Sequence, residues 1–246
     1  MTITEFFESG IIGKLFFANP ESTTNTVLMV VAAAVVIIVA YLLGSINFAI
    51  IISGRKYKQD IREFGSKNAG MTNMMRTYGK KAAGLTLLGD ALKAVVACLI
   101  GYALIGHLGS YLAGLFCIVG HIFPVFYKFK GGKGVVTTAV SILMCDPIVF
   151  LIVFAIFVII VLFTRYISLG SVICVMLYPI LLDRINHLFT GSSTPYAVFA
   201  VIIAVLVVIK HWTNIKRLME GKESKFSFKK SVKPEATTST DPTEEK

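Results

Sequence analysis

The 246-residue sequence has little charge for its length, since only 15% of its residues are charged whereas 55% are hydrophobic. A soluble domain of ordinary composition is about a quarter charged. The hydrophobic residues stand in long blocks, and a block of about 18 or more can cross the ~30 Å hydrocarbon core of a bilayer. The composition therefore excludes an ordinary soluble protein and predicts an integral membrane protein.

Other features are missing as well. The four cysteines form no Cys-x-x-Cys pair and lie in or beside hydrophobic segments, so we interpret them as packing residues and expect no metal and no cofactor. No internal repeat of the kind found in many transporters is present, which argues against transport without excluding it. The net charge of +10 points to membrane topology, anionic lipid or anionic substrates, and no nucleic-acid partner is expected.

Seven hydrophobic blocks predict an all-α integral membrane protein with seven transmembrane helices. The blocks cover residues 27–52, 82–105, 111–126, 135–144, 148–164, 167–182 and 196–209, of which the fourth is short for a full crossing. Residues 1–26 form an N-terminal extension that fits an interfacial helix or an irregular terminus equally well. The seven-helix domain spans 27–223, and 224–246 form a basic and then polar tail.

The positions of Lys and Arg predict the orientation. Eight lie in 53–81, three in 127–134, one at Arg165 and nine from Lys210 onward, so that 21 of the 24 fall on one side of the predicted membrane. Positively charged loops remain in the cytoplasm. The N-terminus is therefore expected outside and the C-terminus in the cytoplasm.

The first polar motif, GSKNAGMTNMMRTYG, runs from Gly65 to Gly79. Glycines allow close approach of the backbone to a ligand, successive N–H groups can bind an anion, and Arg76 can bind phosphate through two nitrogens. Read alone, an ordinary charged loop explains the motif equally well. Its candidate ligands are Ser66, Asn68, Thr72, Asn73 and Arg76.

The second motif, GHIFPVFYKFKGGKGVVTT, begins at Gly120 and places Lys133 among three glycines, Gly131, Gly132 and Gly134, at the start of a predicted helix. Helix N-terminal amides and a lysine suit a phosphate. The spacing of a nucleotide-binding P-loop is absent, so neither ATP nor GTP is indicated. The alternative is a glycine loop needed only for a tight turn.

Three further features are ambiguous when read alone. RYISLGS places Ser171 one turn into a helix, where small residues also serve helix packing. KHWTNIKRL places His211 and Asn214 on one helical face, but also fits an aromatic and basic membrane anchor. Asp90 and Lys93 lie three residues apart within a hydrophobic block and fit a functional or a purely structural ion pair.

Taken together and in this order, the motifs resemble those of the bacterial acyl-phosphate:glycerol-3-phosphate acyltransferases. That family shows approximately GSGNxGATNxxRxxG, GHxFPxFxxFxGGKGVAT, RYxSLxS and RHxxNIxRLxxGxE, and the likeness extends from about Tyr41 to Glu223. Four positions depart from the pattern. Lys67 replaces a glycine, Met71 an alanine, Asn47 a usual proline and Lys210 an arginine.

The resemblance implies a monomeric seven-helix enzyme of the bacterial inner membrane with its site facing the cytoplasm. It would move a fatty acyl group from acyl phosphate to the 1-hydroxyl of glycerol 3-phosphate, giving lysophosphatidic acid and phosphate. Catalytic roles fall to His211, Asn214, Lys133 and Arg76, with the remaining candidates binding substrate phosphate or glycerol. None of the four histidines begins an H-x-x-x-x-D dyad, so the base is left open between a substrate phosphate and His211.

Overall fold

The computed structural model describes residues 9–14, 22–191 and 194–226, and every regular element within these ranges is helical. Residues 9–14 form a short helix, whereas the rest of the predicted interfacial segment up to residue 21, and the tail from 227, lie outside the described residues. The elements that follow are α2 (Thr23–Ser45), α3 (Phe48–Tyr57), η1 (Ile61–Glu63), α4 (Met71–Tyr78), α5 (Lys80–Ile122), η2 (Val125–Tyr127), α6 (Val135–Cys145), α7 (Pro147–Thr164), α8 (Ile167–Thr190), α9 (Ala197–Lys210) and α10 (Trp212–Met219).

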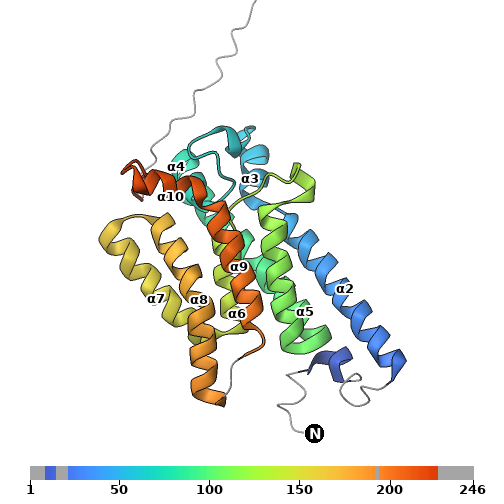
Figure 1. Ribbon diagram of the computed structural model, residues 1–246. Coiled ribbons are helices and arrows are strands. Elements are labelled where there is room, and N and C mark those ends of the chain that lie inside the picture. The colour runs from blue at the N-terminus through green and yellow to red at the C-terminus, as the bar shows by residue number, and fades with distance from the viewer. Residues whose placement is uncertain (1–8, 15–21, 192–193, 227–246) are drawn as a thin grey trace, which may run out of the picture.

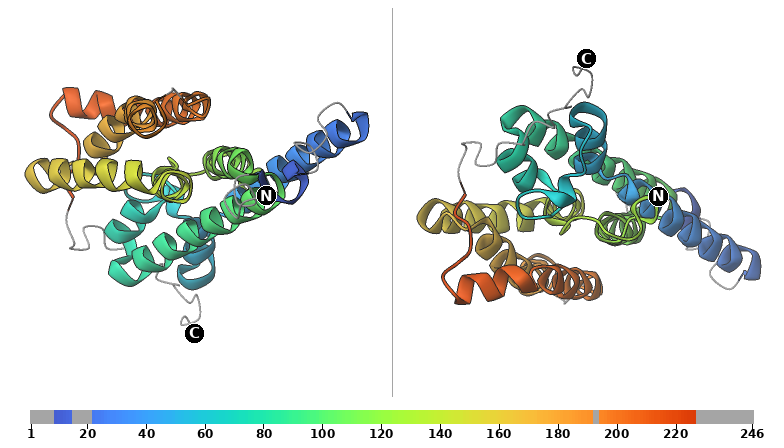
Figure 2. Two further views of the ribbon diagram at one scale, coloured as in Figure 1. Left: turned by 90° about the horizontal axis from the view of Figure 1, so that it is seen from below. Right: turned by 90° about the horizontal axis from the view of Figure 1, so that it is seen from above.

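The long helices pack as a bundle, and the short helices α3, α4 and α10 gather at one end of it (Figure 1). α6 packs against both α5 and α7, and so it joins the half built from α2 and α5 to the half built from α7, α8 and α9. The two views along the bundle show these halves on either side of α6 (Figure 2). The loops that carry the polar motifs meet at the end where α3, α4 and α10 lie.

The first predicted segment, 27–52, is divided into two helices. The break falls at Asn47, whose side chain accepts a hydrogen bond from Ile50 N (3.1 Å) and caps α3. Asparagine is a strong N-cap residue, so this replacement of the family's proline also ends one helix and starts another. Lys93 Nζ donates to the carbonyls of Gly44 (2.9 Å) and Ile46 (2.7 Å) at the end of α2.

α5 turns back on itself and contains two predicted segments, 82–105 and 111–126. Ile105 and Gly106 leave helical geometry, and Gly106 has a φ of 63°. Beyond the turn, Gly109 lies so near Gly101 that a Cβ on Gly109 would meet the Gly101 carbonyl oxygen at 1.9 Å. Lys93 and His121 are 28 residues apart in sequence, or about 42 Å in a straight helix, yet their side chains are 3.0 Å apart.

Among the described residues, four helical stretches are long and apolar enough to cross a membrane, or five if α9 and α10, bent by 59°, form one crossing. The four are Thr23–Tyr57, Lys80–Tyr127, Pro147–Thr164 and Ile167–Thr190. α6 is short, as its sequence predicts, whereas α8 continues to Thr190, beyond the predicted end at residue 182. The outer face of α7 exposes Leu162 and Phe163, a surface suited to lipid. Seven crossings and the orientation stay predictions.

Candidate functional site

A cavity of about 480 Å³ opens among α4, α6, α7, α8 and the start of α10. Polar side chains line one part of it: Ser66, Asn68, Thr72, Arg76, Asp90, His121, Lys133, Ser168, His211, Asn214 and Glu223. Apolar side chains line the rest, among them Val135, Ala139, Phe150, Phe154, Phe157 and Val161. The cavity therefore suits a ligand with an anionic head and an apolar chain.

Lys133 lies at the junction of the second motif with α6. Gly134, with a φ of 78°, turns the chain into the helix, so the free amides of the first helical turn lie beside the lysine. The Lys133 ammonium hydrogen-bonds Asn214 Oδ1 from the α10 side. Burial lowers the pKa of Lys133 to about 8, while the Glu223 carboxylate opposes this effect.

Gly131 and Gly132 support this junction but do not line the cavity. The Gly131 N–H donates to Ile122 O (3.2 Å) and the Gly132 N–H to His121 O (3.1 Å). Their amides are thus used to attach the loop to the end of α5. The lysine, Gly134 and the start of α6 are left facing the cavity.

Arg76 reaches the cavity from the last turn of α4, and its Nη2 donates to Ser224 O (3.3 Å). Burial lowers the pKa of this guanidinium, and the Glu223 carboxylate opposes the shift. Ser66, Asn68 and Thr72 line the same wall. The first motif thus brings one cation and short polar side chains to the cavity.

Asn73, by contrast, lies behind this wall. Its Nδ2 donates to three carbonyl oxygens, those of Ile61 (3.1 Å), Phe64 (2.9 Å) and Asn68 (3.1 Å), and its Oδ1 accepts from Ser66 N (2.9 Å). The side chain is fully buried. Asn73 therefore shapes the loop that presents Ser66 rather than facing the cavity itself.

His211 occupies the bend between α9 and α10. Its Nδ1 lies 2.8 Å from Val207 O, and because a carbonyl can only accept, Nδ1 carries a proton. Burial lowers the pKa of His211 to about 4, so the ring is neutral at pH 7 and its Nε2 is an acceptor. A hydroxyl group in the cavity is a suitable donor to it.

Glu223 lines the cavity although its sequence position did not predict a site residue; it ends the fourth motif of the family pattern. Its carboxylate accepts hydrogen bonds from Ser168 Oγ (2.8 Å), Asn214 Nδ2 (2.6 Å) and Arg217 Nε (2.8 Å). Burial alone would raise the pKa of Glu223, but these hydrogen bonds lower it. Glu223 therefore joins α8, α10 and the segment after α10 at the cavity rim.

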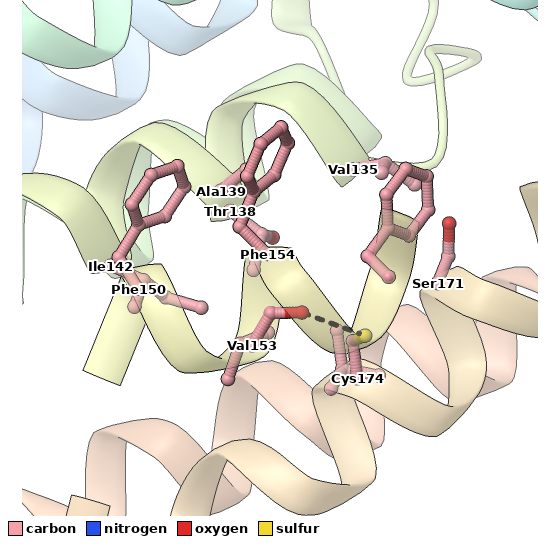
Figure 3. Close-up of a pocket in the computed structure, with 11 residues that line it drawn as sticks. Val135, Thr138, Ala139, Ile142, Phe150, Val153, Phe154, Ser171 and Cys174 are labelled. Carbon is pink, nitrogen blue, oxygen red and sulfur yellow. Dashed lines mark hydrogen bonds between the residues drawn. The ribbon is translucent and has the colours of Figure 1, made fainter. Parts of the chain in front are cut away.

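Ser171 lies outside this cavity. Its hydroxyl donates to Ile167 O (2.8 Å) and lines a smaller, almost wholly apolar cavity of about 60 Å³ among α6, α7 and α8. Figure 3 shows Ser171 in the smaller cavity with the rings of Phe150 and Phe154, which line both cavities. It also shows the hydrogen bond from the Cys174 thiol to Val153 O. The smaller cavity thus continues the apolar part of the larger one.

The structure brings eight of the predicted site residues to one cavity: Ser66, Asn68, Thr72, Arg76, Lys133, Gly134, His211 and Asn214. Asn73, Gly131, Gly132 and Ser171 lie around it. His121, Ser168 and Glu223 line the cavity without having been predicted, and Asp90, predicted as half of a functional or a structural ion pair, lines it too. All four stand in or beside motifs already singled out, but residue spacing did not distinguish them from packing residues.

Fold and site together define a helical membrane protein with a cavity lined by cationic and other polar side chains at one part and by apolar side chains at the rest. The sequence model described as glycerol-3-phosphate acyltransferase matches residues 34–221. A glycerol-3-phosphate acyltransferase of Thermoanaerobacter pseudethanolicus is 42% identical over 79% of this chain and 96% of its own length, and one of Clostridioides difficile is 39% identical over 78% and 94%.

The crystal structure of PlsY, an integral membrane glycerol 3-phosphate acyltransferase, in its glycerol 3-phosphate form superimposes with a TM-score of 0.71. It is 34% identical over 79% of this chain and 96% of that one. Its lysophosphatidic acid form superimposes with a TM-score of 0.68. The chain belongs to the glycerol-3-phosphate acyltransferase family, which confirms the resemblance and the expectation of a helical integral membrane protein.

Proposed function

We propose that the protein transfers a fatty acyl group from acyl phosphate to the 1-hydroxyl of sn-glycerol 3-phosphate, the first acylation in phospholipid synthesis. The main support is that one cavity is lined both by the polar side chains of Arg76, Lys133, His211 and Asn214 and by several phenylalanines. Both substrates carry phosphate, and one carries a long apolar chain. Glycerol 3-phosphate binding by a PlsY structure of the same fold supports the acceptor.

In the proposed reaction, the 1-hydroxyl oxygen attacks the acyl carbon and the anhydride bond from that carbon to the phosphate oxygen breaks. The hydroxyl proton leaves with the inorganic phosphate, and lysophosphatidic acid is formed. Lys133, Arg76 and the first turn of α6 offset the charge on the phosphate groups, and positioning supplies the rest. A base with a pKa of about 4 is poorly matched to neutral pH, which favours the substrate phosphate as proton acceptor and His211 as the group that orients the hydroxyl.

We further propose that the protein acts as a monomer in the bacterial inner membrane, with seven crossings, the N-terminus outside and the cavity facing the cytoplasm. The support for this orientation is that 21 of the 24 Lys and Arg residues fall on one side of the predicted membrane. The polar motifs come from those loops. A cavity on that side would receive a soluble glycerol phosphate from the cytoplasm and a lipid from the bilayer.

The test uses purified protein with palmitoyl phosphate and glycerol 3-phosphate, with a chelator present and with neither acyl-CoA nor acyl carrier protein. Mass spectrometry should detect lysophosphatidic acid and released phosphate in equal amounts. Activity with acyl-CoA but none with acyl phosphate would overturn the proposed donor. Accumulation of unchanged substrate inside proteoliposomes would point to transport instead.

A further inference from the structure

Three ionisable side chains form a buried cluster beneath the loop that carries Lys133. Asp90 and Lys93 come from the first arm of α5 and His121 from the end of the second, and each is at most 5% exposed. Lys93 Nζ lies 3.0 Å from Asp90 Oδ1 and 3.0 Å from His121 Nδ1. Charges within a membrane bundle are costly and mark functional positions more often than structural ones.

Lys93 determines which imidazole nitrogen carries the proton. An ammonium group can only donate, so His121 Nδ1, at 3.0 Å from it, must accept. The alternative, an Nδ1 proton directed to Asp90 Oδ1, has to span 3.6 Å, which is too long for a hydrogen bond. The proton of the neutral ring therefore resides on Nε2.

The Nε2 side of the ring lies against Gly132, in the loop that carries Lys133. A Cβ on Gly132 would lie 2.2 Å from Nε2, so the imidazole is directly against the loop, and His121 lines the same cavity as Lys133. Within the described ranges, no protein group forms a hydrogen bond with Nε2, whereas Nδ1 has Lys93. An N–H donor on a cavity-lining side chain that has no protein acceptor is available to a ligand or to water.

We propose that His121 donates its Nε2 proton to a phosphate oxygen of a substrate, and that Asp90 and Lys93 are positioning residues that fix its tautomer. Lys93 also donates hydrogen bonds to the Gly44 and Ile46 carbonyls at the end of α2. The ammonium therefore cannot rotate away from the ring without losing these hydrogen bonds. The Asp90 carboxylate offsets the lysine charge in this apolar setting. The proposal rests on the proposed function, because it takes the cavity to bind phosphate.

A pair of substitutions separates the two ring nitrogens. The amide of His121→Asn occupies the Nδ1 position, so it keeps an acceptor for Lys93 but removes the donor. The amide of His121→Gln extends to the Nε2 position and restores a donor there. We expect His121→Asn to raise KM for one phosphate substrate about tenfold, and His121→Gln to remain within about threefold of the wild type.

Measuring KM separately for glycerol 3-phosphate and for palmitoyl phosphate identifies which phosphate receives the bond. His187→Asn is the matched control, since His187 is exposed and 19 residues beyond Ser168 in α8, about 28 Å along the helix. It should leave both KM values unchanged. Equal kinetic losses in His121→Asn and His121→Gln, or no loss in either, would overturn the proposal.

A measurement on the wild type keeps the proposal testable if the variants fold poorly, and it does not depend on turnover. In protein with 15N-labelled histidine, the His121 Nε2 resonance should be that of a protonated nitrogen. It should shift on titration with glycerol 3-phosphate or with palmitoyl phosphate, each added alone, whereas glycerol should have no effect. Lys93→Met should move the proton to Nδ1. An unprotonated Nε2 in the wild type, or a resonance that shifts with neither glycerol 3-phosphate nor palmitoyl phosphate while enzyme activity is intact, would refute it.

Discussion

Polar clusters stand at the two ends of α6, and they are built in different ways. At its N-terminal end, Lys133 faces a cavity that Arg76 from α4 and the imidazole of His211 also line. After its last residue, the Asp146 carboxylate accepts hydrogen bonds from the Tyr111 hydroxyl (2.7 and 2.6 Å) and the Tyr178 hydroxyl (3.3 Å). Both tyrosines are at most 3% exposed.

The difference between the two clusters lies in where their donors point. At Asp146 two hydroxyls satisfy one carboxylate, so the cluster ties α5 and α8 to the corner between α6 and α7 and offers little to a ligand. Among the described residues, the cations that act on Lys133, namely Arg76, Lys210 and Arg217, outnumber the carboxylate of Glu223. Buried polar groups that satisfy one another stabilise a fold, whereas an excess of donors around a cavity binds anions.

The largest expected effect separates the cavity cations from other cations of the same loops. Lys133→Ala and Arg76→Ala should each lower kcat/KM at least about 30-fold, or about 2 kcal/mol of transition-state stabilisation. The controls are Lys130→Ala and Arg55→Ala, whose side chains are exposed and should tolerate the change. Initial rates with palmitoyl phosphate would measure this, and a wild-type rate for either cavity variant would remove that residue from the site.

The opposite result is expected at the other end of α6. Tyr111→Phe removes a hydrogen bond to a carboxylate and should cost about 1.5–3 kcal/mol of stability, while KM for both substrates stays within about twofold. Thermal unfolding in detergent followed by size-exclusion chromatography would show the lower Tm. A large KM change with an unaltered Tm would mean that the Asp146 cluster is part of the site after all.

Raising the pH should weaken only the cavity cluster. The Lys133 pKa of about 8 means that its ammonium is present below pH 8 and lost above it, so KM for glycerol 3-phosphate should rise up to roughly tenfold between pH 7 and pH 9. Lys133→Arg keeps its charge over this range and should give a flatter profile. An unchanged wild-type KM at pH 9 would contradict a phosphate-binding role for this ammonium.

The smallest effect concerns Lys67, which replaces the family's glycine between the cavity residues Ser66 and Asn68. Its φ of 57° lies in the left-handed region, where a side chain costs about 1 kcal/mol. Lys67→Gly should therefore raise Tm slightly and change KM less than threefold, because the ammonium is exposed. Lys67→Ala keeps the strain and removes the charge, so an equal rise in Tm for both variants would exclude the backbone explanation.

Helix positions could be predicted from hydrophobic blocks, and α6, α7 and α9 begin and end within one residue of their predicted bounds. The division of the first block into two helices could not be predicted. Asn47 is a polar residue within an apolar run, and only the structure shows that its side chain caps α3. The hydrophobic block that predicts α8 ends at residue 182, but the residues after it allow a helical extension through Leu188 and Phe189, and α8 does continue to Thr190.

The motifs predicted which loops form the cavity, but not which side of each residue faces it. Asn73 and Ser171 turn to nearby carbonyl oxygens, an outcome set by loop geometry that spacing does not encode. Glu223 was missed because it follows a helix and its partners lie on other elements. The Asp90–Lys93 pair was visible, but its third member, His121, is joined to it only by the fold-back of α5.

Phe154 lines both cavities and is 48% exposed. A chain beside this ring can pass between the cavity and the surrounding lipid without entering water. Kinetics should then follow surface dilution: adding inert lipid or detergent lowers the mole fraction of acyl phosphate in the membrane phase while the aqueous concentration of glycerol 3-phosphate stays constant. Saturation by the two substrates must therefore be expressed in different units, one per area of membrane and one per volume of water.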